Sequence, residues 1–365
     1  MRIVFWQNCI SPHQMPYIIK LLNDSRVQEV VVVSDEVTSK ERINMGWQQD
    51  ITKEAETLKI FIHPEIDIVE KLLHKDQEKS WHMFSGINSF PYISQIFKLS
   101  LNYHIKRGLI TERPYTFAFG RANGKPLWVH RLRFLIQDFK YAKYIDKVFV
   151  MGNDGVDYFK SVFKRWEVIP FCYCTNTKTT NISNIRGTSK FCFIGSLSCR
   201  KSPITIVKAA AQLNKEFEIT YIGGGEQQKK IENYINQHKL NNVTILGFQK
   251  MEEIPSILSN QDILILPSIY DGWGAVVNEA LQSGLYVISS NQCGAKDLLK
   301  DPRCGKIFES GNFKQLSQIM KDCVEHINEI RLNRSYRANW AENHISGDVI
   351  AKYMIDHLEK LEFNL

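Results

Sequence analysis

The chain has 365 residues, a length that suggests two domains and excludes a small scaffold held together by disulfides. Apolar residues make up 44% and charged residues 23%, with 20 Gly and 11 Pro, and this composition excludes disordered and fibrous proteins. The 46 Lys and Arg residues outnumber the 39 Asp and Glu residues, which gives a formal net charge of +7. We therefore expect a folded, soluble protein with a basic bias.

The positive charge is concentrated between Lys98 and Arg165. This segment holds 14 basic and five acidic residues, so it carries a net charge of +9 while the rest of the chain carries −2. Local positive charge of this kind favours an anionic partner, a class that includes membrane lipid, phosphorylated substrates and nucleic acid.

The cysteines and the N-terminal residues indicate the compartment. The eight cysteines show no zinc-binding spacing, because only Cys172 and Cys174 lie close together. The N-terminus has neither the apolar core nor the cleavage site of a signal peptide, and no apolar run reaches the ~18 residues of a membrane span. We expect a reducing, cytoplasmic location, with most cysteines acting as small buried apolar residues.

The first half of the chain opens with a predicted βαβ unit. Apolar and β-branched runs predict strands, and apolar residues at helical spacing predict helices. The expected strands are residues 2–6, 29–34, 58–62, 81–84, 115–119 and 147–151, and the expected helices are residues 16–22 and 91–104. The tract 175–189, rich in Thr, Asn and Ser, is the expected linker.

The second half alternates strands and helices at regular intervals. The expected strands are residues 191–195, 217–223, 243–246, 263–266 and 286–290, and the expected helices are residues 204–213, 226–238, 254–258 and 275–283. Such alternation builds a doubly wound parallel sheet, in which ligands bind beyond the carboxyl ends of the strands. The loops after these strands are therefore the expected location of a site.

The most specific segment is residues 267–281. A buried strand ends here, a glycine-flanked turn follows, and a helix starts near Gly274, which points backbone N–H groups at whatever occupies the loop. Asp271 and Glu279 add two carboxylates, and a carboxylate on an apolar stretch needs a partner. The pattern fits an anion site, and the structural alternative is a helix cap at Asp271 with a salt bridge at Glu279.

Two further loops carry signals for ligand binding. Arg200 and Lys201 follow a predicted strand as adjacent cations suited to clamping a diphosphate, and the alternative is a solvated basic loop. Three glycines at 223–225 end the next strand and permit close approach of a ligand to the backbone, although a plain tight turn has the same composition.

Together, residues 193–302 resemble the donor-binding domain of retaining glycosyltransferases of family 4 (glycosyl transferases group 1), which have the GT-B fold. The family's hallmark is an acidic pair separated by seven residues inside a Pro-Ser…Glu-Gly-Phe-Gly…Glu-Ala pattern. The segment Asp271-Gly272-Trp273-Gly274…Glu279-Ala280 is similar, with Asp for the first Glu and Trp for Phe. The family's order is also followed by Gly195…Arg200-Lys201, the glycine turn 223–225, Gly247-Phe248 and the strand 262–268.

The resemblance implies a GT-B architecture of class α/β, in which two Rossmann-like, doubly wound parallel-sheet domains face a central cleft. On this basis we expect residues 1–174 to form the acceptor-binding domain and residues 175–189 the linker. Residues 190–345 would bind the nucleotide-sugar donor, and residues 346–365 would form a helix that packs back on the first domain.

The resemblance also implies roles for individual residues. Asp271 would contact hydroxyls of the donor sugar, Glu279 the nucleotide ribose and Lys201 the donor diphosphate. The family's arginine after the loop glycine is replaced by Ser196, and Arg200 is the candidate substitute. Asp271, Lys201 and Arg200 are thus the expected catalytic residues. The expected donor-binding residues are Glu279, Gly195, Gly223, Gly224, Gly247, Phe248, Gly272, Trp273, Gly274, Ala275 and Val276.

The expected chemistry needs no metal and no cofactor beyond the nucleotide-diphosphate sugar that serves as donor substrate. Breaking the bond between sugar and diphosphate develops negative charge on the leaving phosphate, which fixed cations stabilise. GT-B enzymes generally work without a metal ion. The nearest match to an Asp-x-Asp metal site is Glu65 and Asp67, which we interpret as a solvated loop.

Two histidines are candidates for the acceptor side of the cleft. His13 follows the first predicted strand, and His82 ends a predicted strand whose carboxyl end faces the cleft. A hydrogen-bonded structural histidine is the alternative for His13.

These observations predict a glycosyltransferase that moves a sugar, with retention of configuration, to a saccharide or lipid-linked acceptor in cell-surface polysaccharide or glycolipid synthesis. The +9 segment predicts peripheral association with the anionic inner face of the membrane, and not binding to nucleic acid. The alternatives are a sugar-nucleotide 2-epimerase of the same fold and a non-enzymatic nucleotide-sugar or nucleic-acid binding protein, whose bases would stack on aromatic residues of the basic segment.

Overall fold

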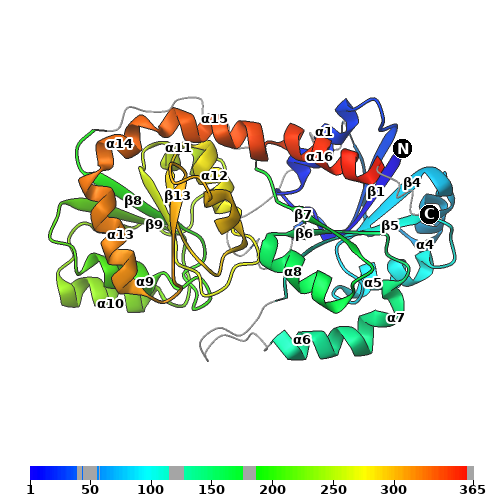
Figure 1. Ribbon diagram of the computed structural model, residues 1–365, viewed down its shortest axis with the longest axis horizontal. Coiled ribbons are helices and arrows are strands. Elements are labelled where there is room, and N and C mark those ends of the chain that lie inside the picture. Colours follow the sequence, from blue (N-terminus) through cyan, green and yellow to red (C-terminus); the bar gives the residue numbers. More distant parts are fainter. Residues whose placement is uncertain (39–42, 44–55, 57, 115–126, 176–185, 360–365) are drawn as a thin grey trace.

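Two parallel sheets, each covered by helices, make up the computed structural model (Figure 1). The structure describes the whole chain except residues 39–42, 44–55, 57, 115–126, 176–185 and 360–365. This arrangement of two α/β domains is the predicted fold class. The expected strand at 115–119 and most of the expected linker lie outside the described residues.

The first sheet has seven parallel strands in the order β3-β2-β1-β4-β5-β6-β7. Its central strands are buried on both faces, as expected for apolar runs in a sheet covered by helices. The strands are β1 (Arg2–Cys9), β2 (Glu29–Glu36), β3 (Lys59–Ile62), β4 (Ser80–Phe84), β5 (Lys106–Glu112), β6 (Lys147–Met151) and β7 (Glu167–Phe171).

The second sheet has six parallel strands in the order β10-β9-β8-β11-β12-β13. In both sheets the strand order reverses beside the first strand, which creates the switch point where such sheets bind ligands. The strands are β8 (Ser189–Ile194), β9 (Phe217–Ile222), β10 (Val243–Ile245), β11 (Ile263–Leu266), β12 (Tyr286–Ser290) and β13 (Gly305–Phe308).

Helices cover both faces of each sheet. In the first domain they are α1 (Met15–Lys20), α4 (Ile66–His74), α5 (Pro91–Ser100), α6 (Leu127–Arg133), α7 (Phe139–Ala142) and α8 (Asn153–Val162), with a π-helical turn, η3 (Phe134–Asp138), between α6 and α7. The second domain has α9 (Ile204–Ala210), α10 (Gln228–His238), α11 (Ile254–Ser259), α12 (Val276–Gln282), α13 (Phe313–Glu325), α14 (Ile327–Leu332) and α15 (Arg334–Ile345). Short 3₁₀ turns are η1 (Leu21–Asn23), η2 (Gln77–Lys79) and η4 (Gly294–Leu299).

The last helix, α16 (Gly347–Glu359), returns to the first domain and packs against α1 (Figure 1). Its apolar side, which includes Met354 and Ile355, is fully buried. Arg26 of the first domain reaches it with ion pairs of 2.9 Å to Asp356 and 2.7 Å to Glu359. Residues 360–365 of the expected C-terminal helix lie outside the described residues.

Polar contacts close the interface between the domains. The Arg113 guanidinium donates to the backbone oxygen of Gln292 at 2.9 Å and lies over the Tyr270 ring, 5.0 Å from its centre. The Tyr270 hydroxyl donates back to the Arg113 oxygen at 2.5 Å. Asp154 forms ion pairs with Arg113, at 3.1 Å, and with Lys296. These contacts fix how the carboxyl ends of the two sheets face each other.

The sequence missed three strands, of which β5 matters most. Its apolar run is short, because charged residues occupy both ends of the strand. One of them, Arg107, is nevertheless buried. Its guanidinium donates to the backbone oxygens of Ser100, Tyr103 and Ile105, the last at 3.0 Å. The bond to Ser100 satisfies the last carbonyl of α5, and the other two hold the turn that follows, so the helix ends at Ser100 and not at the predicted residue 104.

No helix among the described residues is long and apolar enough to span a membrane.

Candidate active site

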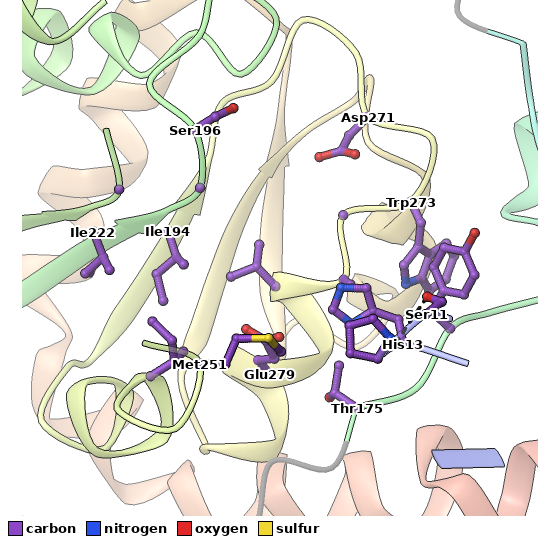
Figure 2. A pocket seen from close by; sticks show the side chains of 18 of the residues that line it. Ser11, His13, Thr175, Ile194, Ser196, Ile222, Met251, Asp271, Trp273 and Glu279 are labelled. Carbon is purple, nitrogen blue, oxygen red and sulfur yellow. Dashed lines mark hydrogen bonds between the residues drawn. The ribbon is translucent and has the colours of Figure 1, made fainter. Parts of the chain in front are cut away.

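A cleft of about 750 Å³ lies between the domains, where the carboxyl ends of both sheets meet. The first domain contributes the loop after β1, the end of β5 and the crossover residues Tyr173 and Thr175. The second domain contributes the loops after β8, β9 and β11 and the start of α12. Figure 2 shows Ile194, Ile222 and Met251 on one side of the cleft and His13 on the other, with Glu279 between them.

Asp271 in the loop after β11 meets both predicted cations. The Lys201 Nζ forms an ion pair with its Oδ2, and the Arg200 guanidinium lies 3.6 Å from its Oδ1. A backbone hydrogen bond of 2.8 Å from Ile269 N–H to the Arg200 oxygen ties the two loops together. The side chains of Lys201 and Asp271 are 14% and 11% exposed, so the pair is partly shielded from water but still borders the cleft.

Glycines let the ends of β8 and β9 approach closely. Gly223 has φ +131°, and a Cβ there would lie 2.0 Å from the backbone oxygen of Gly195. Backbone strain and lack of space therefore both exclude a side chain at this position. Gly224 supports the Phe248 ring, because a Cβ at Gly224 would lie 2.7 Å from that ring. Phe248 is 51% exposed and forms part of the cleft wall. Gly224 therefore contributes by supporting Phe248, and Gly247 accepts a 2.7 Å backbone hydrogen bond from Gly223 N–H. Neither glycine lines the cleft itself.

The start of α12 forms the floor of the cleft through Gly274, Ala275 and Val276. Gly274 has φ +96°, and a Cβ there would lie 2.8 Å from a Leu266 methyl group, so this turn requires glycine. The N–H groups of Val277, Asn278 and Glu279 donate to the oxygens of Gly274 and Ala275. The backbone of residues 274–276, ahead of these groups, therefore borders the same space as the two cations.

Glu279 is the second carboxylate of the cleft. It lies in the first turn of α12, and burial raises its pKa to about 7. The helix is held in place by Asn278, which donates to the Tyr173 oxygen at 2.8 Å and accepts from the Trp273 indole at 2.8 Å. A carboxylate that changes charge near pH 7 therefore lies beside the predicted ligand.

Glu112 is a third acid of the cleft, and the sequence did not predict it. It ends β5, accepts a hydrogen bond from Tyr173, and packs on Gly272, where a Cβ would lie 1.8 Å from its Oε2. Burial, followed by the negative charge of Asp271, raises the pKa of Glu112. Recognition of β5 as a strand would have drawn attention to this residue, since it stands at a carboxyl end facing the cleft.

The two candidate histidines have different surroundings. His13 lines the cleft, and its backbone oxygen accepts from Cys174 N–H at 3.1 Å. His82 is 0% exposed in β4, does not line the cleft, and accepts a 3.1 Å hydrogen bond from the Trp6 indole. Burial lowers its pKa well below the usual value. The prediction that His82 faces the cleft is therefore wrong, because in a fully covered parallel sheet both faces of a central strand are buried.

Most of the predicted site residues converge on the cleft. Those that line it are Asp271, Lys201, Arg200, Glu279, Gly195, Gly223, Phe248, Trp273, Gly274, Ala275, Val276 and His13. Gly224, Gly247 and Gly272 lie directly behind this wall. Among the described residues, no group of three or more His, Cys, Asp and Glu side chains has an arrangement suited to a metal ion.

Comparison with known proteins shows what the second domain is similar to. Residues 176–346 match the family model for glycosyl transferases group 1. The chain is 26% identical over 188 residues to a Campylobacter jejuni enzyme, GalNAc-alpha-(1->4)-GalNAc-alpha-(1->3)-diNAcBac-PP-undecaprenol alpha-1,4-N-acetyl-D-galactosaminyltransferase. This match covers 49% of the present chain and 52% of that enzyme. The chain spans about half or less of the length of the curated relatives it matches.

Solved structures of GT-B proteins match the chain over almost its whole length. The lipopolysaccharide outer core galactosyltransferase WaaB is 16% identical, with a TM-score of 0.72 over 99% of this chain and 100% of that one. HepE of Anabaena, solved in complex with UDP, gives the same identity, TM-score and coverage. At this identity the likeness shows the fold.

The raised pKa of Glu279 predicts a pH-dependent stability. The folded protein keeps the Glu279 proton up to about pH 7, whereas the unfolded chain releases it near 4.5, so rising pH lowers the free energy of unfolding across this range. Glu279→Gln removes this cost. The stability gain of the variant over the wild type should therefore grow by about 2–3 kcal/mol between pH 5 and pH 8, measured by urea unfolding.

Glu342→Gln, at an exposed position of α15, is the matched control and should show no such trend. An equal gain for Glu279→Gln at both pH values would contradict the raised pKa.

Proposed function

We propose that this chain, whose residues 176–346 match the family model for glycosyl transferases group 1 within a GT-B fold, moves a sugar from a nucleotide-diphosphate donor to a saccharide or lipid-linked acceptor. The proposal includes retention of anomeric configuration, no requirement for a metal ion, and a place in cell-surface polysaccharide or glycolipid synthesis. One observation carries it: two cations, three carboxylates and the start of α12 surround one cleft between the domains.

The chemistry of the cleft wall orders the parts of a donor along it. The apolar side, with Ile194, Ile222 and Phe248, suits the nucleotide base, and Glu279 suits the ribose hydroxyls. The diphosphate would then meet Lys201 and the start of α12, where cations and N–H dipoles favour an anion. The similar HepE has been solved with UDP and with UDP-glucose, which supports a uridine donor as the first to test.

Transfer in this cleft would proceed by attack of an acceptor hydroxyl oxygen on the anomeric carbon. The new oxygen–carbon bond forms as the bond from that carbon to the diphosphate oxygen breaks, and the leaving phosphate takes the hydroxyl proton. Lys201 and Arg200 stabilise the negative charge that develops on the phosphate, while Asp271 accepts a hydrogen bond from the sugar. These two cations would supply the charge that a metal ion supplies in other transferases.

The ion pair between Lys201 and Asp271 couples donor binding to the chemistry. A diphosphate that binds Lys201 competes with Asp271 for its ammonium group. The ammonium has three N–H donors, but it lies in one place at a time, so moving toward the phosphate weakens its pair with Asp271. The carboxylate is then available to a hydroxyl of the donor sugar. A nucleotide without a sugar gains affinity from its contact with Lys201, but it has no sugar hydroxyl to donate to the released Asp271.

The first domain would bind the acceptor through Glu112 and His13, which line the opposite wall. Glu112 stands next to the Asp271 loop, so a hydroxyl held by Glu112 would lie close to the sugar. The related Campylobacter jejuni enzyme is named for a diphosphoundecaprenol-linked acceptor, which supports a lipid-linked saccharide as one acceptor class to test.

Lys201→Ala and Asp271→Asn should separate phosphate binding from sugar handling. We expect Lys201→Ala to weaken UDP-sugar binding about tenfold and to lower transfer about 10²- to 10³-fold, because the leaving phosphate loses its main cation. Asp271→Asn should lower transfer by a similar factor but leave UDP affinity equal to or higher than that of the wild type, because Lys201 is freed. Titration calorimetry with UDP and product analysis with UDP-sugar measure the two effects.

Lys229→Ala, on the exposed side of α10, is the matched control for loss of a cation. Parallel loss of UDP affinity in both cleft variants would contradict the competition, and transfer unchanged in both would overturn the site. Release of a 2-epimer of the donor sugar without any acceptor would favour the epimerase alternative.

Glu112→Gln tests the acceptor side, because the amide keeps the packing on Gly272 but loses the negative charge. The KM for the acceptor should rise about tenfold or more, consistent with loss of a hydrogen bond to a charged group. The dissociation constant of the donor should stay unchanged. Steady-state kinetics with varied acceptor, together with calorimetry of the donor, decides the matter. An unchanged acceptor KM would remove Glu112 from the acceptor site.

A further inference from the structure

One helical segment of the first domain carries an unusual share of the exposed apolar surface. Of the fourteen large apolar residues that are exposed among the described residues, seven lie between residues 127 and 144. Trp128 and Ile136 are 65% and 70% exposed. The seven are Leu127, Trp128, Leu132, Leu135, Ile136, Phe139 and Tyr144. Isolated exposed apolar residues are ordinary, but a concentrated group marks an interaction surface.

The sequence spacing places three of these side chains on one side of α6 and the start of η3. Residues 128, 132 and 135 follow one another at intervals of four and three, which is the repeat of a single helix face. Phe139 is half-exposed, and its ring centre lies 6.4 Å from that of the buried Phe134 and 5.8 Å from that of Phe163. The segment runs through α6, η3 and α7, and Figure 1 shows α6 projecting from the rest of the first domain. We call the exposed side of residues 127–144 the α6–α7 face.

Contacts on the opposite side fix the rotation of this segment. Phe134 is buried and packs edge-on against Trp166, with ring centres 5.4 Å apart. Asn88 donates to the Asp138 carboxylate at 2.6 Å. Since the segment already has a buried side, the α6–α7 face cannot turn inward to hide its apolar residues.

Exposed cations accompany the apolar residues. Residues 127–144 hold Arg131, Arg133, Lys140 and Lys143 against a single acid, Asp138, which the contact with Asn88 holds on the inner side. Two of these cations donate to neutral groups: Arg133 to the Gln137 side-chain oxygen at 2.9 Å, and Arg131 to the Ser161 hydroxyl at 3.1 Å. That contact brings the α6–α7 face beside the end of α8, where Lys160 is also exposed.

We propose that the α6–α7 face docks the protein on an anionic lipid surface, with the apolar side chains in the interface and the cations at the level of the headgroups. An amphipathic helix with Trp and Leu beside Arg and Lys has the composition of segments that lie in the membrane plane. The proposal goes beyond the proposed function, because docking needs no donor and no transfer chemistry. It also refines the origin of the +9 charge, since Arg107 and Lys147 of that segment are buried and cannot contribute.

The charge of the α6–α7 face favours lipid over a second copy of the chain. Two copies that met through this face would bring four cations of each into contact with like charges, and no exposed acid of the face offsets them. An anionic bilayer supplies the complementary charge and an apolar layer together.

Flotation with vesicles tests the docking. The full chain is mixed with vesicles of phosphatidylcholine alone, or with 30% phosphatidylglycerol, at low and high salt. We expect at least tenfold stronger partitioning onto the anionic vesicles at low salt. Two variants test the face: Trp128→Ser/Leu132→Ser/Ile136→Ser and Arg133→Glu/Lys140→Glu. Each should reduce partitioning tenfold or more while thermal unfolding and UDP-sugar binding stay unchanged, because none of these residues lines the cleft.

Matched controls come from the second domain. Leu332→Ser removes an apolar side chain that is 84% exposed, and Lys229→Glu/Lys230→Glu reverses two exposed cations of α10. Both should leave vesicle binding unchanged. Quenching of Trp128 fluorescence by brominated lipid, absent in Trp128→Ser, would show directly that the ring enters the bilayer.

Three results would overturn the proposal: no binding of the wild type to anionic vesicles, equal losses in the control variants, or a dimer without lipid that the triple Ser variant converts to monomer. The last would assign the face to a second copy. Vesicle binding without transfer in any donor assay would refute the proposed function and leave the docking intact.

Discussion

The ion pair between Lys201 and Asp271 is the contact around which the rest of the site is arranged. Asp271 is fixed by backbone hydrogen bonds of 3.1 Å, to the Gln292 oxygen and from Gly294 N–H. Gln292 in turn accepts from Arg113 of the first domain, and Glu112 of that domain lies against Gly272. Contacts of the Asp271 segment therefore connect the loop after β8, the loop after β11 and the opposite domain. A donor and an acceptor bound in the cleft would both contact these elements.

The sequence predicted the second domain well because its signals are local. Short apolar strands alternate with amphipathic helices between residues 191 and 290, and glycines such as Gly223 and Gly274 are required where the backbone has positive φ and no space for a side chain. Lys201 and Asp271 could be identified from their positions after predicted strands. That they pair with each other, 70 residues apart, follows only from the sheet order that places β11 beside β8.

What the sequence missed depends on contacts between distant segments. Glu112 belongs to the cleft because β5 carries it toward a glycine 160 residues later, and a strand with a buried arginine gave no clear apolar pattern. His82 was misplaced because the sequence of β4 does not reveal that helices cover both faces of the sheet. The basic segment was recognised as a whole, but only the fold separates the buried Arg107 from the exposed Arg133 and Lys140.

Thermal unfolding with a panel of UDP-, GDP- and ADP-sugars tests most directly whether the cleft binds a donor. A ligand at 100 times its dissociation constant adds about 2.7 kcal/mol to the free energy of unfolding, which is readily seen as a rise in Tm. We expect sugars of one nucleotide base to raise Tm, and Lys201→Ala to lose most of that rise. No shift with any nucleotide sugar at millimolar concentration, or an equal shift in Lys201→Ala, would contradict the assignment of the cleft.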